Sequence, residues 1–341
     1  MLDTFLYAFE AVAPLIILIL LGMWFKKIRL FSDEFVSKGY SFSFRVALPC
    51  LLFCNVYSID SIESIDFRTV LYATLITVVS FIIASVIAVL MIKDKRQRGV
   101  IVQCFFRSNC AIIGLSLTES LAGVSGLASV SVITAFTIPL YNILAVIALS
   151  IFNTDVEEDK DHGINWKKIF INIAKNPLII GVCLGLLCLA VRGFIPENAD
   201  GEKAFLLSRE LKVIYSSVKN VGNIASPFMI MILGAKFTFS AVSKLKYQIT
   251  IGVIGRIIFT PCLAIGLGYL LSLTGLLDLG PAEYAAFIAV FATPVAVSTA
   301  IMAREMNNDD ILAGQLVVWT SVFSVLTIFL FVVVLRTLGL L

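Results

Sequence analysis

The stretch Phe287–Gly314, FIAVFATPVAVSTAIMAREMNNDDILAG, decides how the rest of the chain is interpreted. At 1.5 Å per helical residue, Pro294 lies roughly 16 Å from Glu283 and roughly 15 Å from Arg304. That is the middle of a hydrocarbon layer about 30 Å thick. Proline removes a backbone donor and frees the carbonyl one turn earlier, and lipid tolerates such groups only where protein, water or a ligand satisfies them. The stretch therefore predicts a membrane helix that is broken at a binding site.

The composition of the whole chain is that of an integral membrane protein. Of its 341 residues, 59% are hydrophobic and only 14% are charged, and the mean hydropathy is +0.99. These values exclude an ordinary soluble domain, and the apolar runs recur along the whole length. The cysteines fall inside apolar runs without metal-binding spacing, so we expect no disulfide framework, no metal site and no cofactor.

The apolar runs predict an all-α protein with ten transmembrane spans, each long enough to cross the hydrocarbon layer. The longest hydrophilic stretch, residues 153–166, is interpreted as a linker between two halves of five spans, 1–152 and 167–341. The predicted spans cover residues 5–25, 35–58, 68–92, 99–121, 125–152, 167–191, 207–235, 247–273, 282–303 and 310–336.

Basic residues alternate between the connections and predict the orientation. The first, third, fifth and seventh connections are rich in lysine and arginine, as cytoplasmic loops are. We therefore expect these connections in the cytoplasm, and both termini on the outer side of the cytoplasmic membrane. The residues concerned are Lys26, Lys27, Arg29, Lys38, Lys93, Lys95, Arg96, Arg98, Lys160, Lys167, Lys168, Lys236, Lys244 and Lys246.

The two halves contain similar motifs in the same order, which predicts an internal repeat. APLIILILLG in the first span and NPLIIGVCLG in the sixth both place a proline eight residues before a glycine. An offset of 185 residues aligns Asn109 with Pro294 and carries the fourth and fifth spans onto the ninth and tenth. With five spans per half, the second copy is inserted upside down, and inverted repeats of this kind form their substrate site where they meet.

The fourth span, VIVQCFFRSNCAIIGLSLTESLAG, carries the polar triplet Arg107–Asn109 near its middle. An arginine at mid-membrane costs at least about 2.5–3.5 kcal/mol on insertion scales, so it faces the protein interior and has a partner. Two interpretations remain open for Arg107. It is a cation beside the path of an anionic substrate, or it pairs structurally with Glu119, another buried carboxylate or the carbonyls of a broken helix. Arg256 in the eighth span poses the same alternatives, and there the structural one is favoured.

Together these segments resemble the auxin efflux carriers, a family that includes plant PIN-formed proteins and bacterial carboxylate permeases. ATPVAVSTAIMAREMNNDDILAG at 292–314 is similar to the family's ninth helix and KNPLIIG at 175–181 to the opening of its sixth. ALPCLLF at 47–53 resembles its second-helix signature, and Arg256 five residues before Pro261 fits its eighth helix. The resemblance runs in order over nearly the whole chain.

This resemblance implies a fold, a mechanism and a function class. The fold has ten helices in two inverted five-helix repeats whose broken helices four and nine cross, like that of sodium/proton antiporters and bile-acid symporters. Spans one, two, six and seven form a scaffold, and spans three to five with eight to ten form a moving transport domain. The implied function is that of a secondary transporter, not an enzyme, which moves a small organic anion, a carboxylate, by an elevator-like alternating-access mechanism.

The candidate site combines the polar residues at the two breaks with the positions implied by the resemblance. The candidate substrate-binding residues are Ala47, Arg107, Ser108, Asn109, Asn176, Thr293 and Pro294. Candidate substrates are malate, malonate or an auxin-like weak acid. We expect membrane lipid around the protein, a homodimer as a candidate assembly, and no nucleic-acid partner.

One departure from the family concerns the fourth helix, where proline often stands beside the asparagine and again after the glycine. Those places hold Ser108 and Ser116 here. The break in this helix must therefore form without proline.

A membrane-embedded enzyme and an anion channel are the alternative functions. The single histidine, His162, lies in the charged linker and suggests a solvated residue rather than a catalyst. A channel predicts a continuous polar face along its helices, whereas these spans carry isolated polar residues.

Overall fold

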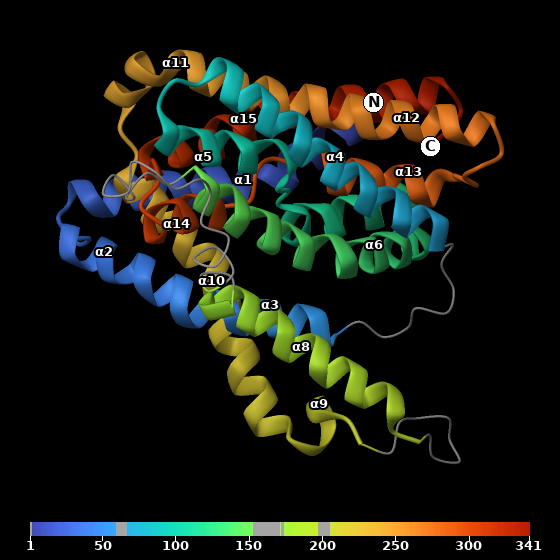
Figure 1. Ribbon diagram of the computed structural model, residues 1–341, viewed down its shortest axis with the longest axis horizontal. Helices are drawn as coiled ribbons and strands as arrows, with labels where there is room; N and C mark the ends of the chain where they lie inside the picture. The colour runs from blue at the N-terminus through green and yellow to red at the C-terminus, as the bar shows by residue number, and fades with distance from the viewer. Residues whose placement is uncertain (1, 59–66, 153–170, 172–173, 197–204) are drawn as a thin grey trace, which may run out of the picture.

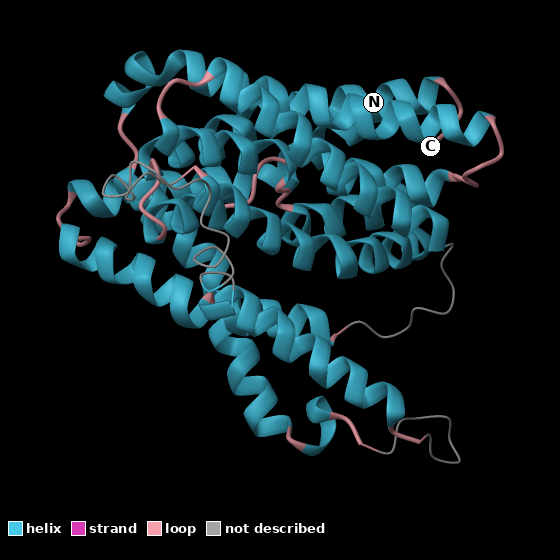
Figure 2. Ribbon diagram, viewed as in Figure 1, coloured by secondary structure: helices cyan, strands magenta, loops and turns pink. Residues whose placement is uncertain are grey.

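The computed structural model describes residues 2–58, 67–152, 171, 174–196 and 205–341, and Figures 1 and 2 show helices joined by short loops throughout these ranges. The predicted linker at 153–166 lies outside the described residues. The α-helices are α1 Leu2–Lys27, α2 Asp33–Phe42, α3 Leu48–Tyr57, α4 Phe67–Met91, α5 Lys95–Phe106, α6 Leu115–Ile151, α8 Pro177–Phe194, α9 Leu207–Glu210, α10 Lys212–Lys236, α11 Phe239–Ile254, α12 Thr260–Leu273, α13 Pro281–Phe287, α14 Ser298–Glu305 and α15 Asp310–Thr337. Four π-helical segments interrupt them: η1 Ser43–Ala47, η2 Cys110–Gly114, η3 Gly255–Phe259 and η4 Ile288–Ala292.

The helices form a multi-pass membrane protein. In the described part of the chain, seven are long and apolar enough to cross a bilayer: Asp33–Tyr57, Phe67–Met91, Leu117–Ile151, Pro177–Phe194, Lys212–Lys236, Phe239–Leu273 and Asp310–Thr337. The first predicted span lies within α1, whereas the fourth and ninth are broken into shorter helices, α5 with the start of α6, and α13 with α14. Both chain ends lie at the same end of the bundle in Figure 1, and the side of the membrane that they face stays a prediction.

The predicted boundary between the fourth and fifth spans, at residues 122–124, is confirmed. Helix α6 is kinked there, and within it Gly123 alone leaves helical geometry, with φ 62° and ψ −148°. Glycine tolerates this left-handed φ because it has no Cβ. Within the predicted sixth span, α8 begins at Pro177, because Asn176 is extended and its side chain caps the helix by accepting from the backbone amide of Leu178. The predicted start at residue 167 lies outside the described residues.

The π-helical segments follow from the prolines. Segments η1, η3 and η4 each end two residues before a proline: Pro49, Pro261 and Pro294. A proline donates no hydrogen bond and its ring pushes against the carbonyl one turn earlier, so the preceding turn widens. Segment η2 ends two residues before Ser116, with the same spacing and without proline. The widened turn of the fourth span therefore forms without a proline.

Small residues let α8 approach α3 closely. A Cβ atom added to Gly181 would lie 2.6 Å from the carbonyl oxygen of Pro49, and one added to Gly185 would lie 3.0 Å from that of Phe53. The two glycines stand four residues apart, so both face the same neighbour. The sixth span therefore packs closely against the second.

The remaining contacts group the other helices. Helix α10 packs along α1 and α3, whereas α4, α5, α6 and α11 to α15 pack on one another. Helix α1 contacts α10 and also α15, so it borders both groups. In Figure 1, α8 and α9 extend away from the bundle formed by α4 to α6 and α11 to α15.

Candidate functional site

The two helix breaks cross and are hydrogen-bonded to each other. Residues after α5 and after η4 leave helical geometry, and Ser108 and Val295 form an isolated antiparallel bridge. The backbone amide of Asn109 donates to the Pro294 carbonyl at 2.9 Å, and the backbone amide of Ala296 donates to the Arg107 carbonyl at 3.1 Å. Each break thus satisfies backbone groups that the other has freed, as a membrane interior requires. The predicted crossing of the two segments is confirmed.

Two hydroxyl groups reinforce the crossing. The Ser108 and Thr293 hydroxyl oxygens lie 2.6 Å apart, across 185 residues of sequence. Thr293 also donates to the Ala289 carbonyl at 2.8 Å, and the Val295 amide donates to the Thr320 hydroxyl at 3.2 Å. The sequence separation of Ser108 and Thr293 equals the offset at which the two halves align. Ser108 therefore provides, by side-chain bonding, an anchor for a break that has no proline.

Arg256 ties both breaks together from η3. Its guanidinium group is fully buried and donates to the carbonyls of Thr293 at 2.8 Å, Phe105 at 2.9 Å and Val290 at 3.2 Å. The structural interpretation of Arg256 is thereby confirmed.

Arg107 has polar but uncharged partners. It donates to the Gln103 side-chain oxygen at 3.0 Å, to the Asn142 side-chain oxygen at 2.8 Å and to the Met302 sulfur. Glu119 is exposed, and among the described residues no carboxylate pairs with Arg107. The structural pair with Glu119 is wrong, because that side chain lies on the surface. A buried cation with neutral partners can gain more from an added anion than one that is already paired.

A cavity of about 70 Å³ lies beside the crossing. It has room for a few waters, or for part of a small ligand. Helices α3 and α10 form one wall, and the crossing, α6 and the start of α14 form the other. Its lining residues are Leu48, Leu51, Leu52, Asn55, Arg107, Ser108, Asn109, Cys110, Ile138, Tyr141, Asn142, Ser226, Met229, Ala296, Val297 and Ser298.

Asn109 provides an unused donor at this cavity. Its side chain is 5% exposed, and its amide nitrogen has no hydrogen-bond partner among the described residues. An unpaired buried donor costs about 1–3 kcal/mol, so a water or a ligand atom that accepts from it is favoured. Arg107 and Asn109 thus line the same cavity with a cation and with a side-chain amide nitrogen that has no partner among the described residues.

The structure brings some of the predicted site residues together and separates others. Arg107, Ser108 and Asn109 line the cavity. Thr293 and Pro294 are buried behind them in the crossing. The remaining two, Ala47 and Asn176, are buried but are not among the lining residues. The cap on α8 occupies the Asn176 side-chain oxygen, which accepts from the Leu178 amide at 2.9 Å.

Sequence reasoning missed several polar lining residues, among them two asparagines and a serine within the spans. Asn55 lies on α3, Asn142 on α6 and Ser226 on α10, each within an apolar span. An asparagine inside a membrane span is a signal in its own right, since its amide needs partners. Asn55 and Asn142 could have been found in this way, whereas serine is too common in such helices to stand out.

A second cavity adjoins the first. It measures about 140 Å³ and shares the lining residues Asn55 and Ile138 with the first. Ser58, Ser131 and Thr134 add hydroxyl groups to its wall. Ser58 follows α3, so the second cavity leads from the crossing toward that end of the helix.

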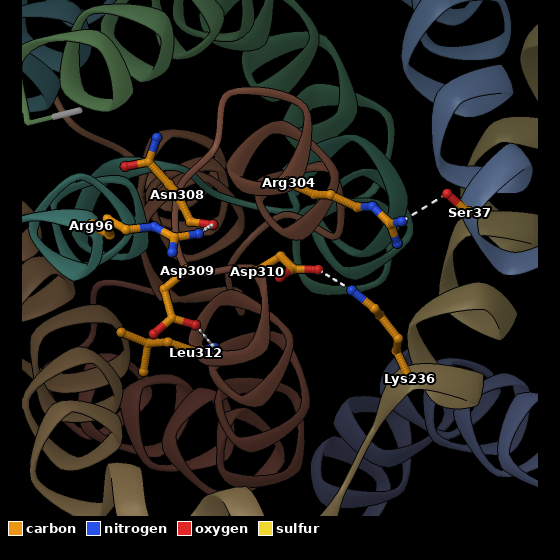
Figure 3. A network of polar contacts seen from close by, with 8 residues as sticks. All are labelled: Ser37, Arg96, Lys236, Arg304, Asn308, Asp309, Asp310 and Leu312. Atoms are coloured by element: carbon orange, nitrogen blue, oxygen red, sulfur yellow. Dashed lines mark hydrogen bonds and ion pairs between the residues drawn. The ribbon is translucent and has the colours of Figure 1, made fainter. Parts of the chain in front are cut away.

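Polar contacts join α2 and α10 to α14 and α15 (Figure 3). Arg304 on α14 donates to the Ser37 hydroxyl on α2 at 2.8 Å, and Lys236 on α10 pairs with Asp310 at the start of α15. Both cations also lie over the Tyr40 ring, at 4.7 Å for Arg304 and 5.5 Å for Lys236. These contacts join α2 and α10 to the helices that follow the crossing. We refer to Ser37, Tyr40, Lys236, Arg304 and Asp310 as the polar clamp.

Comparison with protein families finds one described as membrane transport protein, which matches residues 7–332. No curated protein matches the chain. The family match spans nearly all of the sequence, from α1 to α15, and includes both helix breaks, the cavity and the polar clamp. The chain therefore belongs to the membrane transport protein family, that of the auxin efflux carriers.

Proposed function

We propose that this secondary transporter carries a small organic anion, a carboxylate of the size of malate, malonate or an auxin-like weak acid, across the cytoplasmic membrane. Membership of the family makes the protein a transporter and not an enzyme. The single observation that supports the substrate class is that one cavity is lined both by Arg107, whose partners are all neutral, and by Asn109, whose side-chain amide nitrogen has no partner among the described residues.

The chemistry of the cavity favours an anion for two reasons. The first is a guanidinium group that already has neutral contacts to orient it, so that its charge is available to a carboxylate. The second is the direction of the helices. Segment η2 begins at Cys110 and α14 at Ser298, and both residues line the cavity. Helix N-termini carry partial positive charge, and discontinuous transporter helices use them to bind anionic substrate groups.

The proposed mechanism is an elevator-like movement of one group of helices against another. The scaffold comprises α1 to α3 and α8 to α10, and the transport domain comprises α4 to α6 and α11 to α15. The cavity lies between the two groups, with α3 and α10 on one side and the crossing on the other. Because the crossing belongs wholly to the proposed transport domain, a substrate bound there would travel with it. The two halves would be inverted repeats related at the crossing, with both termini on the outer side.

Ligand-induced stabilisation of the purified protein tests the substrate class. Malate, malonate and indole-3-acetate are compared with their neutral amides, and we expect only the acids to raise the melting temperature. Arg107→Met and Asn109→Ala should each weaken binding of the stabilising acid about ten- to a hundredfold, because each removes a hydrogen bond that involves a charged group. Arg98→Met and Asn223→Ala are matched controls that lie outside the cavity. Equal affinity in the cavity variants and the controls would refute the proposed site.

Transport in vesicles separates a carrier from a channel. A carrier loaded with unlabelled substrate accelerates uptake of labelled substrate, because the occupied transport domain returns faster than the empty one. A channel shows no such trans-stimulation. Flux without trans-stimulation, at any internal concentration of the acid, would contradict the proposed mechanism.

A further inference from the structure

We infer that Arg256 has two roles. It is a positioning residue that holds the two helix breaks in register, and it supplies a second fixed positive charge, on the side of the crossing away from the cavity, that favours a dianionic substrate. This inference rests on the proposed function for its statement about specificity. The statement about register stands on the geometry of the breaks. Arg256 lies on η3, outside both broken helices, and is absent from the cavity wall.

The three carbonyls that Arg256 binds are ones that broken helices leave without helical partners. Val290 stands four residues before Pro294, so its carbonyl is the one that the proline orphans. Phe105 lies in the last turn of α5, where carbonyls have no intrahelical donor. Thr293 belongs to the extended segment between η4 and α14. One planar group with a fixed fork of donors thus serves both breaks, which an ammonium group could not match in geometry.

The neighbours of Arg256 support this arrangement. Thr260, one turn later, donates to the same Phe105 carbonyl at 3.0 Å. Gly255 allows the Phe105 ring to lie directly on the backbone of η3, because a Cβ at this position would overlap the ring. The end of α5 is therefore held against η3 by two side-chain donors and by one close backbone contact.

The position of the charge gives Arg256 its second role. Thr293, Val290 and Phe105 do not line the cavity, so Arg256 reaches the crossing from the side away from it. In the described chain no carboxylate forms an ion pair with Arg256, and carbonyl dipoles alone compensate its charge. Charges within a low-dielectric interior are weakly screened. Two cations without an ionic partner, Arg107 on the cavity side of the crossing and Arg256 on its other side, should therefore favour a dianion over a monoanion.

A disulfide across the crossing tests the register without any substrate. Ser108 and Val295 are a non-hydrogen-bonded antiparallel pair, whose Cα atoms stand about 4.5 Å apart, which suits a disulfide. Ser108→Cys and Val295→Cys are introduced in a background that lacks the native cysteines. We expect fast oxidation with Arg256 present, and oxidation slowed at least tenfold in Arg256→Lys and in Arg256→Met. Unchanged oxidation in a folded variant would overturn the positioning role.

Binding measurements test the charge, with the native cysteines and Ser108 in place. The readout is the ratio of the dissociation constants for propionate and malonate, a monoanion and a dianion of similar size. Arg256→Lys keeps the charge and should keep the ratio, whereas Arg256→Met should reduce it about tenfold. An equal ratio in wild type and Arg256→Met would overturn the specificity role. Where Arg256→Met does not fold, Arg256→Gln replaces it, with the same expectation and the same refuting result.

The two tests fail separately from the proposed function. Oxidation of the cysteine pair requires no ligand. If wild type binds none of propionate, malonate, malate and indole-3-acetate, the proposed carboxylate function and the specificity role that rests on it are refuted together, while the positioning role is decided by the disulfide alone.

Discussion

Replacing Gly181 by alanine tests the close packing of α8 on α3. The added Cβ would lie 2.6 Å from the Pro49 carbonyl oxygen, about 0.8 Å short of ordinary contact, and the obstacle is backbone rather than a flexible side chain. Overpacking of this kind costs about 1–3 kcal/mol, and the better helix propensity of alanine returns at most about 1 kcal/mol. We expect a net loss of about 1–2 kcal/mol in the free energy of unfolding. Thermal and denaturant unfolding of the purified protein in detergent measure it.

Gly193 provides the matched control on the same helix. No atom lies within 4 Å of a Cβ added at that position, so Gly193→Ala gains helix propensity without a clash. This control should unfold at the wild-type temperature or slightly above it. The reasoning about the α3–α8 contact would be refuted if Gly193→Ala and Gly181→Ala changed the free energy of unfolding by the same amount.

The remaining predictions concern the site and the movement. Asn176→Ala should lower stability by about 1 kcal/mol through the lost cap, and Asn176→Asp should restore it. Anion affinity reduced in both variants would identify Asn176 as a substrate contact as well, and unchanged affinity would exclude it. A disulfide between α3 and α8 should leave transport intact. A bifunctional thiol crosslinker that joins Ser37→Cys to Arg304→Cys should stop transport, because these two residues lie on the two different groups of helices. Transport by the fully crosslinked protein would contradict domain movement. Asp310→Asn should weaken the polar clamp by about 0.2–1 kcal/mol, because it breaks one partly exposed ion pair. Lys236→Met should weaken the clamp further, because it also removes the contact with the Tyr40 ring, and the double variant should lose no more than Lys236→Met alone. Fully additive effects of the two substitutions on thiol-labelling rates would contradict this coupling.

The positions of the helices could be predicted well because apolar length and charge are local properties. Pro294 marked its break directly, since a proline removes a donor whatever surrounds it. The other break was harder to predict, because Ser108 replaces the proline and the kink depends on Thr293 and on backbone pairing far along the chain. The polar triplet at 107–109 indicated the place and could not indicate the geometry.

The partners of the two buried arginines show where the sequence stops being informative. One of the interpretations open for Arg107 was a pair with a carboxylate, because salt bridges are the simplest way to compensate a buried charge. The structure uses Gln103, Asn142 and Met302, which come from three different helices. Which neutral side chains surround a cation is a property of tertiary packing. The spacing of residues along the chain does not predict which helices supply these partners, and it does not predict that α3 and α10 form one wall of the cavity.

The crossing also imposes an order on how the protein is made. Ser108 bonds to Thr293 across 185 residues, so one break is synthesised long before the other. At about 5–20 residues per second, the ribosome needs about 10–40 s to add the intervening chain. During that interval the backbone amide of Asn109 lacks its acceptor, the Pro294 carbonyl, and the Arg107 carbonyl lacks its donor, the backbone amide of Ala296. Lipid tails cannot replace either partner, because they form no hydrogen bonds. The first five spans can therefore be inserted early, but the crossing is completed only after the ribosome has passed Ala296.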